Sequence, residues 1–88
     1  MEQGFHQGSG FRRLLARFPG REDAIRRAAL GDRTFRELCD DLLLAITALE
    51  RFERRPDAAQ RIEIPEYRRI IAELEAELTD YLATRRHG

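Results

Sequence analysis

The chain has 88 residues, and its 16 basic and 16 acidic side chains give a formal net charge of zero at pH 7. Hydrophobic residues make up 42% and charged residues 36%, which is too apolar for a disordered chain and too charged for a membrane span. The first ten residues lack an apolar secretory core, and the one cysteine cannot form an internal disulfide. The sequence therefore predicts one small cytoplasmic domain.

The N-terminal part predicts a disordered tail followed by a short helix. Residues 1–8 are polar and rich in glycine, and we expect the ordered domain to span 9–88. A helix over 9–18 is predicted because apolar side chains recur there at helical spacing. These side chains are Phe11, Leu14, Leu15 and Phe18. Pro19-Gly20 is expected to end the helix.

The next two helices are marked by their start and stop signals. The second is predicted over 22–30, with Gly31 as its C-terminal signal. The third is predicted over 34–54, where Thr34 and Glu37 match a capping box, in which a hydroxyl and a carboxylate each accept a hydrogen bond from an unpaired backbone N–H group.

The apolar surface of the third predicted helix is unusually wide. Its residues step by 3, 4, 3, 4 and 3, which is a heptad pattern. They are Phe35, Leu38, Leu42, Ala45, Leu49 and Phe52, with Cys39 and Ile46 beside them. Leu44 lies outside this arc, about 200° from Leu42 on a helical wheel. One neighbouring helix cannot cover such a surface.

A fourth helix is predicted over 65–85, after Arg55-Pro56 ends the third and a polar connection follows. Pro65 suits its first turn, where the missing N–H has no partner to lose. Its apolar arc is narrower and is centred on Tyr67, Ile71, Leu74, Leu78 and Tyr81.

These elements predict an all-α fold in which two short N-terminal helices precede a long antiparallel helical hairpin. Either the N-terminal helices or a second copy of the chain could cover the wide arc of the third helix. We expect both to do so, which gives a homodimer with a four-helix arrangement.

Three strings in the long helices suggest a relationship. They are residues 35–41 (FRELCDD), 66–69 (EYRR) and 73–77 (ELEAE). They resemble segments of small, uncharacterised bacterial helical-hairpin proteins over about residues 15–82. The resemblance implies a fold and carries no activity, so no functional residue follows from it.

The side chains do not predict an enzyme or a cofactor site. Glu73 and Glu77 are spaced as in carboxylate metal bundles, but neither histidine stands three residues after a glutamate, so no metal is expected. Cys39 falls inside the apolar arc, where a thiol behaves as a small hydrophobic group. The chain has no glycine-rich phosphate loop and no serine–histidine–aspartate set.

The function predicted from the sequence is protein–protein interaction through helix packing, as a homodimer or with an unidentified protein partner. The candidate interaction residues are apolar groups at the edges of the arcs. They are Leu43, Leu44, Phe52 and Tyr81.

Nucleic-acid binding is the alternative function. Residues 1–33 carry seven arginines against four acidic residues, so their side chains could contact phosphates. The candidate contacts are Arg12, Arg13, Arg17, Arg26 and Arg27. Against this reading, the third helix carries three acidic residues in its first two turns, and the net charge of the chain is zero.

A membrane-surface helix over residues 11–18 is a further alternative, because this segment is both basic and amphipathic. Its apolar face also fits the uncovered side of the third helix, and we expect it to pack there.

Overall fold

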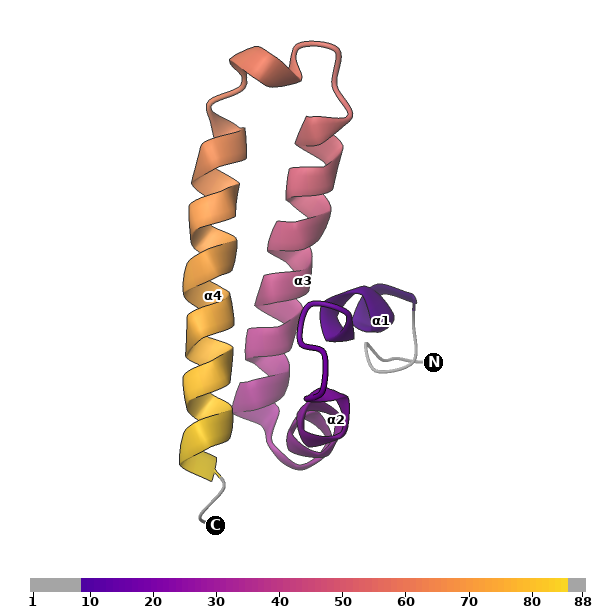
Figure 1. The fold of residues 1–88 in the computed structure, drawn as a ribbon, viewed down its shortest axis with the longest axis vertical. Coiled ribbons are helices and arrows are strands. Elements are labelled where there is room, and N and C mark those ends of the chain that lie inside the picture. The colour runs from indigo at the N-terminus through magenta and orange to yellow at the C-terminus, as the bar shows by residue number, and fades with distance from the viewer. Residues whose placement is uncertain (1–8, 86–88) are drawn as a thin grey trace.

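The computed structural model describes residues 9–85 and confirms an all-α fold built around a long helical hairpin (Figure 1). The elements in chain order are α1 (Ser9–Leu15), α2 (Glu22–Gly31), α3 (Arg33–Glu53), the 3-10 turn η2 (Ala58–Gln60) and α4 (Glu63–Arg85). In Figure 1, α3 and α4 run side by side in opposite directions, and α1 and α2 lie against α3. The predicted tail over residues 1–8 lies outside the described residues.

The core is one apolar cluster to which all four helices contribute. Its largest fully buried side chains are Leu14, Ile25, Phe35, Cys39, Leu42 and Leu78. The face of the first helix, from Phe11 to Phe18, is buried in this cluster. That helix therefore packs inside the fold, as the sequence predicts.

The first helix ends earlier than predicted. Its last residue is Leu15, and Phe18 is reached through tighter turns in which the Arg17 N–H donates to the Leu14 carbonyl and the Phe18 N–H to the Leu15 carbonyl. Gly20 has a φ of 85°, a left-handed conformation that side chains with a Cβ rarely adopt. Pro19-Gly20 lie in a turn, but the helix has already ended four residues before Pro19, so the predicted stop is wrong.

The predicted capping box at the start of α3 is wrong. The helix begins at Arg33, and its N-cap is Asp32, whose Oδ1 accepts a hydrogen bond from the Phe35 N–H at 3.2 Å. An aspartate is as good an N-cap as threonine or better, and it stands in the extended conformation that a cap requires (φ −142°, ψ 113°). Thr34 is therefore an exposed residue of the first turn.

Two other boundary signals also differ from expectation. Gly31 is the last residue of α2, but it has no positive φ, so it does not form a left-handed cap. The fourth helix begins at Glu63, two residues before the predicted start, and Pro65 is its third residue. Pro65 thus lies in the first turn as predicted, where backbone N–H groups lack intrahelical partners.

The wide arc of α3 is covered from within the chain. Helices α1, α2 and α4 all pack on α3, and a Cβ added at Gly10 would lie 3.0 Å from Leu43, which shows how closely α1 approaches. The prediction that one neighbour cannot cover α3 is confirmed, and the N-terminal helices supply the extra cover. Among the described helices, none has the length and apolar character needed to cross a membrane.

Candidate interaction surface

The only cysteine is unsuited to nucleophilic chemistry. Cys39 is fully buried in the core. Desolvation, with a smaller contribution from the charge of Asp40, raises the pKa of the Cys39 thiol to about 12. The thiol is therefore protonated at neutral pH and packs as a small apolar side chain.

Within residues 9–85, no group of three or more histidine, cysteine, aspartate or glutamate side chains could hold a metal ion. The spaced pair Glu73 and Glu77 on α4 belongs to no such group. His6 and His87 lie outside the described residues.

The corner between α2 and α3 is fixed by polar contacts. Asp32 caps α3 through Oδ1, and its Oδ2 accepts a hydrogen bond from the Tyr81 hydroxyl of α4 at 2.6 Å. The Tyr81 ring packs on Phe35 with a centroid distance of 5.3 Å. The Arg36 guanidinium donates to the Ala29 carbonyl at 2.7 Å, which ties α3 to the end of α2. Asp32 therefore joins the α2–α3 corner to the end of α4.

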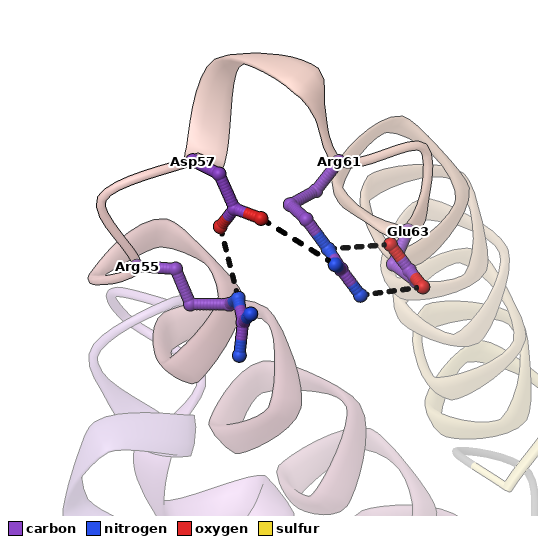
Figure 2. A network of polar contacts seen from close by, with 4 residues as sticks. All are labelled: Arg55, Asp57, Arg61 and Glu63. Carbon is purple, nitrogen blue, oxygen red and sulfur yellow. Dashed lines mark hydrogen bonds and ion pairs between the residues drawn. The ribbon is translucent and has the colours of Figure 1, made fainter.

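The opposite end of the hairpin holds a network of arginine and carboxylate side chains (Figure 2). Asp57 contacts Arg55 at 3.0 Å and Arg61 at 3.5 Å, and Arg61 forms a two-pronged contact with Glu63 at 3.1 and 3.0 Å. The hydrogen bond from Arg55 lowers the pKa of the Asp57 carboxyl. The Arg61 guanidinium lies 5.4 Å from the centroid of the Phe52 ring, a cation–π distance. This network orders the connection between the two long helices.

The four predicted interaction residues have different environments. Leu44 is 69% exposed on the outward side of α3. Phe52 is half-buried and stacks on Tyr67 of α4 with a centroid distance of 5.7 Å. Leu43 is half-buried against the core, and Tyr81 is half-buried in the corner contact with Asp32. Leu44 alone among the four presents most of its surface to solvent.

Two open pockets lie between α3 and α4, and no residue of α1 or α2 lines either of them. The first, which we call the acidic pocket, has a volume of about 490 Å³. It is lined by Thr34, Glu37, Leu38, Asp41, Glu77, Asp80, Tyr81 and Thr84. The second, which we call the aromatic pocket, has a volume of about 560 Å³. It is lined by Leu44, Thr47, Ala48, Arg51, Phe52, Arg55 and Tyr67.

Asp40 of α3, which does not line the acidic pocket, has a raised pKa. Partial burial raises the pKa of the Asp40 carboxyl, and the charges of Asp41 and Glu37 raise it further, against the opposing effect of Arg36. Glu37 and Asp41 were not predicted from the sequence to form part of a surface, although their heptad spacing with Leu44 was the available signal.

The arginines proposed as phosphate contacts are divided by the fold. Arg13 forms an ion pair with Glu50 of α3, and Arg17 forms one with Glu75 of α4. These two side chains fasten the N-terminal helix to the hairpin. Arg12, Arg26 and Arg27 are exposed and pair with no carboxylate among residues 9–85.

No protein family, curated protein or solved structure matches the chain. The resemblance to small bacterial helical-hairpin proteins therefore stays a prediction.

Proposed function

We propose that the chain is a small interaction protein without catalytic activity, and that it acts as a homodimer through the outward flank of α3. The single observation that carries this proposal is Leu44, a large apolar side chain that is 69% exposed in the middle of a 21-residue helix. It lines the aromatic pocket beside Phe52 and Tyr67. Apolar side chains on one helix face can anchor a partner helix in an apolar groove.

The buried thiol and the polar networks at the two ends of the hairpin also support an interaction role. The thiol is protonated and buried, and the polar networks at both ends of the hairpin hold the helices together. A rigid hairpin presents its exposed side chains in a fixed geometry, which lowers the entropic cost of docking. The lone cysteine, which has no partner for an internal disulfide, favours the reducing cytoplasm as its location.

Sedimentation velocity at micromolar concentrations tests this proposal. The wild-type chain should sediment as a dimer, and Leu44→Glu should sediment as a 10.3 kDa monomer, because a carboxylate would be desolvated in the interface. Leu30→Glu is the matched control, since Leu30 is 70% exposed on α2 and lines neither pocket. A monomeric wild-type chain, or an equal effect of both variants, would contradict the proposal.

Nucleic-acid binding is a second candidate function, favoured by the exposed side chains of Arg12, Arg26 and Arg27 on the N-terminal helices. A gel shift at low salt that disappears in an Arg26→Glu/Arg27→Glu variant would support it. No retardation of the wild-type chain would remove it.

A further inference from the structure

The outward flank of α3 carries a second heptad stripe, about 110° around the helix from the heptad that faces the core. Its residues step by 4, 3, 4, 3 and 4. The first five share one side of the helix, and Arg55 follows in the bend after α3 ends at Glu53. They are Glu37, Asp41, Leu44, Ala48, Arg51 and Arg55. Ala48 is half-buried and the other five are exposed. The first two line the acidic pocket, and the last four line the aromatic pocket.

The order of side chains along this stripe is symmetric in position and opposite in charge. Glu37 and Arg55 lie nine residues before and after position 46, and Asp41 and Arg51 lie five residues before and after it. Leu44 and Ala48 lie two residues on either side of the same point. Reversing the direction of the stripe therefore exchanges each acidic residue for an arginine and leaves the apolar centre in place.

We propose that a second copy of this chain docks on the stripe with its α3 antiparallel, across a two-fold axis beside residue 46. This inference rests on the proposed function and adds the register of the dimer. Asp41 then faces Arg51 of the second copy, Glu37 faces Arg55, and Leu44 packs on Ala48. Each contact occurs twice, as two-fold symmetry requires.

Three of the four charged side chains of the stripe form no ion pair within residues 9–85. Glu37 and Asp41 form no ion pair with any arginine of residues 9–85, and Arg51 forms none with a carboxylate of that range. Arg55 pairs with Asp57 at 3.0 Å, and the Arg55 side chain is still 49% exposed to solvent. The antiparallel register gives Glu37, Asp41 and Arg51 the opposite charges that they lack within the chain.

Each pocket receives a complementary side chain in this arrangement. Arg51 of the second copy enters the acidic pocket, where Glu77 and Asp80 of α4 add to the charge of Asp41. Leu44 of the second copy meets the aromatic pocket beside Phe52. A parallel register would instead place Asp41 against Asp41 and Arg51 against Arg51, so like charges disfavour it.

Charge reversal tests the register. We expect Asp41→Arg and Arg51→Asp each to raise the dimer dissociation constant by about tenfold or more, because each change puts like charges together at two symmetric sites. The double variant Asp41→Arg/Arg51→Asp restores opposite charges and should return to within about threefold of the wild-type value. Arg27→Asp, on α2, is the control for a change of charge alone and should leave the constant unchanged.

A mixing experiment gives an independent readout. The Asp41→Arg chain keeps Arg51, and the Arg51→Asp chain keeps Asp41, so a one-to-one mixture pairs opposite charges at both sites. The mixture should form a heterodimer at concentrations where each variant alone sediments as a monomer. Because Asp41 and Arg51 are both exposed, each variant is expected to fold. Thermal melting followed by circular dichroism checks this.

The outcomes separate this inference from the proposed function. If Leu44→Glu dissociates the wild-type dimer but the double charge variant does not recover the wild-type affinity, the antiparallel register is wrong. The interaction surface itself would still stand. A wild-type chain that stays monomeric at 100-fold higher concentration would overturn both.

Discussion

Replacing Asp32 with alanine removes at least two contacts at once, the N-cap of α3 and the hydrogen bond from Tyr81, and each has a typical free-energy cost. The loss of an N-cap costs about 1 kcal/mol, and the loss of the hydrogen bond from the half-buried Tyr81 hydroxyl costs about another 1 kcal/mol. Asp32→Ala should therefore lower the free energy of unfolding by about 2 kcal/mol. In a domain of this size that corresponds to a fall in Tm of roughly 8–16 °C.

A double-mutant cycle tests whether the Tyr81 contact is the reason. Tyr81→Phe alone should cost about 1 kcal/mol, and it should cost measurably less in the Asp32→Ala background, so the two changes are coupled by up to about 1 kcal/mol. Urea denaturation followed by circular dichroism measures each value. Thr34→Ala is the control: it should cost less than about 0.5 kcal/mol, because Thr34 is an exposed helix residue and not the cap. Additive effects in the cycle, or a larger cost at Thr34 than at Asp32, would refute the assignment.

Two further predictions concern the partly buried Asp40 carboxyl and the backbone. Asp40 has a raised pKa in the folded chain, so its ionised form opposes folding at pH 7. This free-energy cost vanishes as the pH falls toward the ordinary pKa of 3.8. Asp40→Asn should therefore raise Tm at pH 7, and its advantage over wild type should shrink by pH 3. An Asp40→Asn chain that melts below wild type at pH 7 would contradict this. Gly20→Ala should destabilise the chain by about 1 kcal/mol because Gly20 has a φ of 85°, whereas Gly31→Ala, in a helical conformation with open space around it, should stabilise it by up to about 1 kcal/mol. Equal melting temperatures for the two glycine variants would show that the backbone assignment is wrong.

The apolar spacing predicted the helices well, because the buried face of each helix is marked by several apolar residues at once. Leu42, Ile71 and Leu78 are buried where the heptad pattern placed them. The helix ends were predicted less well, because each depends on one or two residues whose alternatives are close in free energy. Asp32 and Thr34 are both good N-caps by residue type. Asp32 is selected because it also accepts a hydrogen bond from Tyr81, a residue 49 positions later in the chain.

On the candidate surface, too, spacing along the helix predicted the exposure of some residues, whereas tertiary contacts decided that of others. The exposure of Leu44 followed from its position on the helical wheel, and it is 69% exposed. Leu43 and Tyr81 could not be distinguished from it by spacing. Leu43 is half-covered by the approach of α1 at Gly10, and Tyr81 is engaged by Asp32. Both depend on the placement of the N-terminal segment, which no periodicity within α3 or α4 specifies.

The stripe on α3 carries acidic and basic side chains in equal number, as the whole chain does. A surface that binds a copy of itself must carry both signs in similar number, since each acidic group needs an arginine at the position that two-fold symmetry assigns to it. The stripe carries Glu37 and Asp41 before its apolar centre and Arg51 and Arg55 after it. A nucleic-acid surface would require one sign throughout, because every phosphate is negative. The change of sign along this stripe therefore favours a second copy of the chain over a polyanion as the occupant of this surface, even though the arginines alone are compatible with either.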